Sequence, residues 1–327
     1  MAIVRTGPRL HLGFQNLSLA HERLYGGVGL ALASPRIEVR AERGETIECD
    51  DPAVADYVET VVSVLEVPGA TVEIPARVER HIGLGSGTQL ALACLVAVAR
   101  AYDRTVDARD LAPALGRGGR SGVGVATFER GGFVVDAGHP TERFTTAPPA
   151  RGDWTVPKPI VSSPVPTDWR FVLATPAAEP GPSGPPEDKR MRSVVEHADP
   201  GIADDVATLL TRQLLPALVE GDRSAFGGAA AHLGRLNGAW YADEQGGVYR
   251  PPAGRVVEAL DSIQAISGAG QTSWGPTVYG VTDAESVERA VNGARDALSE
   301  RGLEASVRAV SPRNAGAAGE RRGPEQV

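Results

Sequence analysis

The sequence is poor in cysteine, in aromatic residues and in long apolar runs, and it carries no excess of positive charge. Only two of its 327 residues are cysteines, Cys49 and Cys94, which argues against a disulfide framework or a cysteine-based metal site. The longest apolar run, Leu90 to Ala99, is too short to span a bilayer, and no signal-peptide core stands at the N-terminus. We therefore expect a reduced, cytoplasmic setting and no membrane partner.

The missing positive charge also excludes a broad surface for nucleic acids. The formal net charge is -8, so the chain does not present a basic face to duplex DNA or RNA. With 42% hydrophobic residues over this length, it can still build large globular cores. We expect small molecules as partners and no nucleic acid.

Glycine, in contrast, is abundant, and one glycine-rich turn runs directly into an apolar helix. The segment H-I-G-L-G-S-G-T-Q-L at 81–90 is followed by a stretch to Tyr102 without a helix breaker. Backbone N–H groups at such a helix start can bind an anion. The turn is therefore either a phosphate-binding loop or a tight turn before a buried helix. The residues that would form the phosphate loop are Gly83, Gly85, Ser86, Gly87 and Thr88.

Two more glycine-rich segments follow, at 116–124 and 267–276. The first reads G-R-G-G-R-S-G-V-G, and its Arg117 and Arg120 offer fork-shaped donors for a phosphate. The second reads S-G-A-G-Q-T-S-W-G-P. We expect it to turn towards the first loop, with the Thr272 and Ser273 hydroxyls facing phosphate. Its tryptophan, Trp274, is either a core residue or a ring that stacks on a ligand.

Local patterns predict a β-rich sheet covered by helices, divided by a proline-rich stretch from Ala147 to Asp168. This stretch suggests an N-terminal domain over 1–150 and a C-terminal domain over 168–310, and the polar residues 311–327 suggest a flexible tail. The predicted strands lie at 1–17 with a bend, 28–33, 36–41, 46–49, 71–74, 123–128, 133–136, 169–175, 277–281 and 305–310. The predicted helices lie at 53–65, 89–102, 107–115, 187–197, 202–218, 223–240, 254–266 and 284–300.

The glycine segments, together with R-L-H-L-G-F near the N-terminus and G-G-F-V-V-D-A-G-H after the second loop, resemble the motifs of the GHMP kinase superfamily. The pattern is most similar to the β-ribofuranosylaminobenzene 5′-phosphate synthases and the related C-ribosyl synthases of C-nucleoside antibiotics. The resemblance covers Arg5 to about Val310. It implies an α+β fold with a ribosomal-S5-like N-terminal domain, a ferredoxin-like C-terminal domain with extra helices, a site between them and a homodimer.

That branch transfers the phosphoribosyl group of phosphoribosyl diphosphate (PRPP) to a ring carbon of an aromatic carboxylic acid, and releases CO2 and diphosphate. The acceptor class, a benzoate or an azole carboxylate, stays open, as does the pathway, methanopterin or antibiotic biosynthesis. The departing diphosphate calls for cations, and we expect Mg²⁺. Two alternatives remain: a small-molecule kinase that uses ATP, and a non-catalytic phosphate- or nucleotide-binding module. Against the kinase, many superfamily kinases read S-G-V-D where this chain has Gly124.

The early strand supplies three candidate pocket residues. Arg9 and His11 lie on one face if the strand alternates, either as pocket groups, with His11 catalytic, or as an ion pair and a satisfied core histidine. Asn16 stands where the branch carries an acid, and we place it in the substrate pocket, where this change could alter which acceptor is taken.

Four more residues are candidates for acid–base or metal chemistry. Asp136 and His139 follow a strand in V-V-D-A-G-H-P and could act as acid and base, with Asp136 as a Mg²⁺ ligand, or merely cap a turn. Glu187 and Asp188 begin a helix after a proline–glycine loop. They are either metal-binding acids on a lid or charges that stabilise the helix start.

Overall fold

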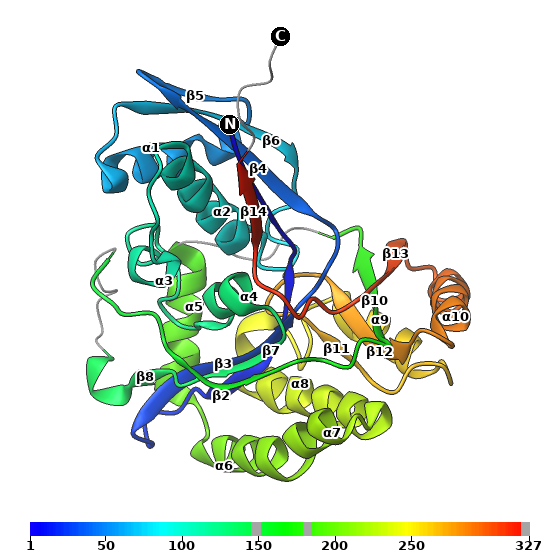
Figure 1. The fold of residues 1–327 in the computed structure, drawn as a ribbon. Coiled ribbons are helices and arrows are strands. Elements are labelled where there is room, and N and C mark those ends of the chain that lie inside the picture. The colour runs from blue at the N-terminus through cyan, green and yellow to red at the C-terminus, as the bar shows by residue number, and fades with distance from the viewer. Residues whose placement is uncertain (145–151, 179–184, 322–327) are drawn as a thin grey trace.

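The computed structural model describes residues 1–144, 152–178 and 185–321, and its strands form three sheets that pack with helices (Figure 1). The first sheet has the order β14-β1-β4-β6-β5, and helices α1 and α2 pack against it. Its elements are β1 (Ala2–Thr6), β4 (Ile37–Gly44), β5 (Ile47–Cys49), α1 (Pro52–Leu65), β6 (Gly69–Ala76), α2 (Ser86–Ala101) and β14 (Ala318–Arg321). Most residues of α2 are buried, as the apolar run predicts.

The second sheet has the order β2-β3-β7-β9, and β8 pairs with β3. Helix α4 packs against β3 and β7, while α8 packs against β2, so the sheet lies between helices from distant parts of the chain. Its elements are β2 (Arg9–Asn16), β3 (Arg23–Ala31), α4 (Val123–Arg130), β7 (Phe133–Asp136), β8 (His139–Pro140) and β9 (Pro159–Ser163).

The third sheet is antiparallel, with the order β11-β12-β10-β13, and packs with α8, α9 and α10. Its elements are β10 (Trp169–Pro176), α8 (Arg223–Gln245), α9 (Ala253–Asp261), β11 (Ala269–Gln271), β12 (Val278–Asp283), α10 (Val287–Glu300) and β13 (Ala305–Val310). The remaining helices are α3 (Ala108–Leu111), the 3-10 turn η1 (Thr141–Arg143), α5 (Pro185–His197), α6 (Pro200–Leu209), the π-helical turn η2 (Leu210–Leu214) and α7 (Leu215–Glu220).

One buried apolar cluster connects the second and third sheets. The Phe226 ring of α8 lies 4.8 Å from the Trp169 ring of β10 and 6.1 Å from the Phe133 ring of β7, measured between centroids. These aromatic contacts fix α8 between the two sheets. Within residues 1–144, 152–178 and 185–321, no helix combines the length and the apolar character needed to cross a membrane.

The predicted strand at 123–128 is wrong, because this segment forms helix α4. The Gly122 N–H donates to the Asp136 carboxylate at 2.7 Å, and the Thr127 hydroxyl donates to the Val123 carbonyl at 2.8 Å. The packing of α4 against α2 and the second sheet overrides the strand preference of its β-branched residues.

The proline-rich connection and the predicted tail also form strands. Within the connection, β9 pairs antiparallel with β7, while residues 147–151 lie outside the described residues. The flexible-tail prediction is wrong for 311–321, because β14 pairs antiparallel with β1 and covers the edge of the first sheet (Figure 1). Residues 322–327 lie outside the described residues.

Candidate functional site

A cavity of about 610 Å³ lies where the second sheet meets the three glycine-rich segments, α5 and α8. Its lining carries many more basic than acidic side chains, so that it favours an anionic ligand. The charged lining residues are Arg9, Arg117, Arg120, Arg143, Arg192, Asp153 and Asp188. Its size is in the range of cavities that bind small molecules.

The first glycine loop is shaped around Arg9. Gly85 caps α2 in the left-handed conformation, with a φ of 69°. The Arg9 guanidinium donates to the Gly83 carbonyl at 2.6 Å, which holds the loop against strand β2. Ser86 is not the cap that its position suggests, because its hydroxyl donates to the Glu79 carbonyl at 3.0 Å. Of the five predicted loop residues, only Thr88 lines the cavity, and the rest form the backbone behind it.

The third glycine segment meets the first, as predicted. The Thr272 hydroxyl donates to the Gly83 carbonyl and accepts from the His11 backbone N–H, both at 3.0 Å. Thr272 is fully buried and cannot face a phosphate, whereas Ser273 lines the cavity. Trp274 also lines it, and its indole Nε1 is buried without a hydrogen-bond partner among the described residues.

The two arginines of the second loop point to different neighbours. The Arg117 guanidinium bonds the Tyr57 hydroxyl and lies 5.0 Å from the centroid of that ring, close to Gly87 of the first loop. The Arg120 guanidinium instead pairs with the Asp188 carboxylate of α5. The loop therefore serves two sides of the cavity rather than one.

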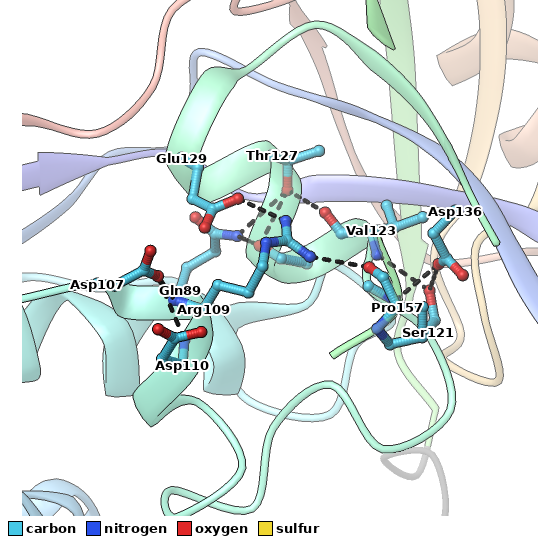
Figure 2. A network of polar contacts seen from close by, with 12 residues as sticks. Gln89, Asp107, Arg109, Asp110, Ser121, Val123, Thr127, Glu129, Asp136 and Pro157 are labelled. Carbon is cyan, nitrogen blue, oxygen red and sulfur yellow. Dashed lines mark hydrogen bonds and ion pairs between the residues drawn. The ribbon is translucent and has the colours of Figure 1, made fainter. Parts of the chain in front are cut away.

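Asp136 is fully buried behind the second loop, and Figure 2 shows it beside Ser121 at the start of α4. Its carboxylate accepts from the backbone N–H groups of Gly122 at 2.7 Å and Gly138 at 2.9 Å. Burial raises the pKa of Asp136, and these hydrogen bonds oppose that shift. Both oxygens of Asp136 are hydrogen-bonded within the protein and the residue is absent from the cavity lining, so it does not meet a ligand there as the predicted acid–base and Mg²⁺ roles require.

His11 and His139 both line the cavity and are joined by a row of rings. His11 lies 4.8 Å from Phe14, which lies 5.8 Å from Tyr25, and Tyr25 meets His139 edge-on at 6.4 Å. Burial, together with Arg143, lowers the pKa of His139. Its Nε2 is buried and has no partner in the described part of the chain. Burial lowers the pKa of His11 as well, so the environment of both rings favours the neutral imidazole.

The structure does not place Asn16 in the pocket. Its amide donates to the carbonyls of Ser18 at 2.8 Å and Arg23 at 2.7 Å, and its oxygen accepts from the Ser18 N–H at 2.7 Å. These bonds hold the turn between β2 and β3, and the residue is absent from the cavity lining. The amide that stands in place of the expected acid therefore stabilises a turn.

The acidic residues offer little to a metal. Among the described residues, no group of three or more histidine, cysteine, aspartate or glutamate side chains could hold an ion. Asp188 lines the cavity but pairs with Arg120, and the side chain of Glu187 lies outside the described residues.

Several lining residues escaped the sequence analysis. Arg143 and Arg192 belong to no motif, although the Arg192 Nη1 is buried without a partner in the described chain. Gly234 and Tyr241 of α8 also line the cavity, and the Tyr241 ring meets Trp274 edge-on at 5.0 Å. The row of small residues on this helix was the signal in the sequence that could have indicated these lining residues.

Comparisons with known proteins agree with this geometry. Residues 53–132 match the GHMP kinases N terminal domain. The chain is 33% identical to a beta-ribofuranosylphenol 5′-phosphate synthase of Archaeoglobus fulgidus, with 97% of this chain and 98% of the relative covered. An enzyme of the same name from Methanothermobacter thermautotrophicus is 32% identical, with 86% and 88% covered.

Among solved structures, homoserine kinase from Cytophaga hutchinsonii matches with a TM-score of 0.65 at 15% identity, over 98% of this chain and 97% of that one. An identity this low supports a shared fold alone. Together with the domain match, it confirms the α+β fold of GHMP type that the motifs implied.

Proposed function

The chain belongs to the family of β-ribofuranosylphenol 5′-phosphate synthases, and on this basis we propose that it joins PRPP to a ring carbon of an aromatic carboxylic acid. The products are a C-riboside 5′-phosphate, CO2 and diphosphate. One observation carries the proposal: a single cavity is lined by aromatic rings and by five arginines, of which Arg9 and Arg117 lie at the first glycine loop while Arg120 pairs with α5. PRPP has an anionic group at each end, and the acceptor is an aromatic ring.

The diphosphate of PRPP belongs at the first glycine loop. Arg9 and Arg117 lie next to this loop, Thr88 lines the cavity there, and the positive end of the α2 dipole starts at Gly85. Together these groups stabilise the charge that develops as diphosphate leaves C1 of the ribose.

The 5-phosphate belongs at the opposite group, formed by Arg120, Arg143 and Arg192. Arg120 and Arg192 lie close enough to Tyr25 to affect its ionisation, and Arg143 does the same to His139, so the three share one side of the cavity. The unpartnered Nη1 of Arg192 is a donor without an acceptor in the described chain, as expected of a group that binds a ligand phosphate.

The acceptor ring fits the wall made by Trp274, Tyr241 and Tyr249, over Gly234 of α8. Because its curated relatives are named for a phenol product, we propose a 4-hydroxybenzoate-like acceptor. An azole carboxylate is the second candidate, since a flat heteroaromatic ring would use the same wall.

Kinase chemistry is the weaker alternative on this scaffold. A Cβ at Gly124 would lie 3.1 Å from Thr88 Cγ2, so a carboxylate at this position would face the start of α2, but the chain has none there. An alcohol substrate would lack the carboxylate that many kinases of this superfamily place here, whereas an attacking ring carbon has no hydroxyl proton at the reacting atom to lose.

Mg²⁺ enters the proposal as a partner of the diphosphate. Mg²⁺ commonly takes substrate phosphates and one or two carboxylates as ligands. Of the two acidic residues on the described cavity wall, Asp188 pairs with Arg120 on the 5-phosphate side, so Asp153, next to the Trp154 that bonds the Arg117 carbonyl, is the one that could supply such a carboxylate. The ion would neutralise part of the leaving charge.

Incubation with labelled PRPP and a panel of benzoic and azole carboxylic acids, with Mg²⁺, tests the proposed function. We expect equal amounts of diphosphate and CO2, and a ribosylated ring, with at least one hydroxybenzoate. ADP formation from ATP and an alcohol, without these products, would replace the synthase by a kinase. Tight PRPP binding without any turnover would favour a binding module.

Reciprocal substitutions test the orientation of PRPP. Arg192→Met should weaken ribose 5-phosphate binding about tenfold or more, the loss expected for one charge-assisted hydrogen bond, and leave inorganic diphosphate binding nearly unchanged. Arg117→Met should do the opposite. Isothermal titration with each ligand measures both effects, and Arg289→Met on exposed α10 is the control. Equal losses for both ligands in both variants would contradict the orientation.

A further inference from the structure

Behind the cavity wall, Asp136, Ser121 and His11 form a hydrogen-bonded series that the reaction described above does not use. The Ser121 hydroxyl lies 3.0 Å from Asp136 Oδ2 and 3.3 Å from His11 Nε2. His11 and Ser121 line the cavity, whereas Asp136 is fully buried behind them. The series therefore leads from a buried carboxylate to a ring that faces the ligand.

The donors and acceptors of this series determine the direction of each bond. Asp136 accepts from the Gly122 and Gly138 N–H groups, which can only donate, and this pair of donors favours the ionised carboxylate against the effect of burial. Ser121 has a single hydroxyl proton and must donate it to Asp136. Its oxygen is then an acceptor for its other neighbours.

The tautomer of His11 follows from this direction. Ser121 Oγ accepts from the Val123 N–H at 3.2 Å and from His11 Nε2 at 3.3 Å, so Nε2 carries the ring proton. Nδ1 then carries a lone pair, and no described residue donates a hydrogen bond to it. The ring presents a proton acceptor to the cavity.

We propose that Ser121 is a positioning residue that fixes His11 as the general base for the hydroxyl group of the acceptor. The inference rests on the proposed function and deepens it, because it assigns the proton transfer that a phenolic acceptor requires. Asp136 contributes by orienting Ser121, and it does not itself exchange protons with the substrate.

The proposed proton transfer needs no reactant besides PRPP and the acceptor. As the ring carbon attacks C1 of the ribose, the C1–O bond breaks and its electron pair leaves with diphosphate. His11 Nδ1 takes the hydroxyl proton, and the O–H pair becomes the C=O bond of a dienone. When CO2 departs, the C–C pair restores the aromatic ring and His11 returns the proton to the oxygen.

The charged group next to the ring explains why this base acts only after PRPP binds. Burial and then Arg9 lower the pKa of His11 to about 3, which makes it a weak base in the free cavity. Asp136 lies beyond Ser121 and is the nearest acid in the series. PRPP brings negative charge to Arg9, which favours the protonated ring and strengthens the base. The acceptor should therefore react only when PRPP is already bound.

The test compares two acceptors that differ in hydroxyl acidity. With 4-hydroxybenzoate, Ser121→Ala should lower kcat roughly 100-fold, at the low end for a general base, while the KM for PRPP stays within about twofold. With 3,5-difluoro-4-hydroxybenzoate, whose hydroxyl is already ionised at neutral pH, the same variant should lose less than about threefold, since no base is needed. His11→Asn should follow the same pattern.

Ser121→Thr keeps the hydroxyl and should restore most of the rate, and Ser262→Ala at the C-cap of α9 is the control for loss of a hydroxyl outside the cavity lining. Circular dichroism and PRPP titration check that each variant folds. Equal losses with both acceptors would overturn the role of Ser121 and leave the synthase in place. Turnover of azole acceptors but not of 4-hydroxybenzoate would also overturn it. No turnover by the unmodified chain with any acceptor would instead remove the proposed function.

Discussion

Replacing Gly85 with valine is expected to abolish PRPP binding in a chain that still folds. Gly85 has a φ of 69°, and a Cβ built on it would lie 2.9 Å from the Arg9 guanidinium carbon. Arg9 would have to move away from the Gly83 carbonyl, which it now contacts at 2.6 Å. One substitution therefore disturbs both the loop backbone and the arginine that would bind the diphosphate.

The expected loss of PRPP affinity in Gly85→Val is large, whereas the expected loss of folding stability is small. Loss of two charge-assisted hydrogen bonds corresponds to about 3–6 kcal/mol, or a fall in PRPP affinity of at least about 100-fold. The left-handed conformation adds roughly 1–2 kcal/mol of strain for a residue with a Cβ, which a fold stable by about 5–15 kcal/mol tolerates. Isothermal titration with PRPP and urea unfolding measure the two quantities.

Gly302 supplies the matched control. Its φ is 64° and no atom lies within 4 Å of the position that a Cβ would take, so Gly302→Val introduces the same backbone strain away from the cavity. We expect this variant to lose stability and keep PRPP affinity. If Gly85→Val bound PRPP as tightly as the unmodified chain, the loop would be only a turn.

Much of the fold follows from local signals, and the errors have a common physical cause. The helix after Gly85 and the strands at 169–175 and 305–310 were predicted because their apolar spacing matches the elements that form. The prediction failed for two segments, 123–128 and the residues after 311, because their conformation depends on partners far away in sequence. Strand propensity at Val123 and Val125 is overridden by packing on α2.

The candidate site was also predicted only in part, for the same physical reason. Glycine turns are visible in sequence because a backbone that approaches a ligand closely needs residues without a Cβ. Arg143 and Arg192 were missed because single arginines on helical turns look like solvated surface until α5 and η1 fold over the cavity. Ser121 was read as part of a glycine motif, and its role appears only beside Asp136 and His11.

His11 should make the protein lose stability in mild acid. The folded chain holds this ring neutral, with its pKa lowered by burial and Arg9 to about 3, whereas the unfolded chain protonates it near 6.5. Below pH 6.5 the unfolded state therefore binds one more proton, and stability falls by about 1.4 kcal/mol for each pH unit until pH 3. Between pH 6.5 and 5 the loss from His11 is about 2 kcal/mol.

The pH window separates this effect from the paired carboxyl groups, whereas Asp136 and Asp261, whose pKa values burial raises, change stability in the opposite direction. The paired acids Glu38 and Asp283 have lowered pKa values, so their stabilising contribution is lost only in stronger acid. His139, whose pKa burial also lowers, acts in the same direction as His11. Urea unfolding at pH 7, 6 and 5 should show a smaller loss of stability per pH unit in His11→Asn, and a smaller one still in the double variant with His139→Asn. The quantity to compare is the change in unfolding free energy per pH unit, because either substitution also shifts stability by a constant amount at every pH. An unchanged slope in His11→Asn would mean that His11 takes up its proton as readily in the folded chain as in the unfolded one. Such a ring would be exposed to water. It could then not be the neutral base whose orientation Ser121 is proposed to fix.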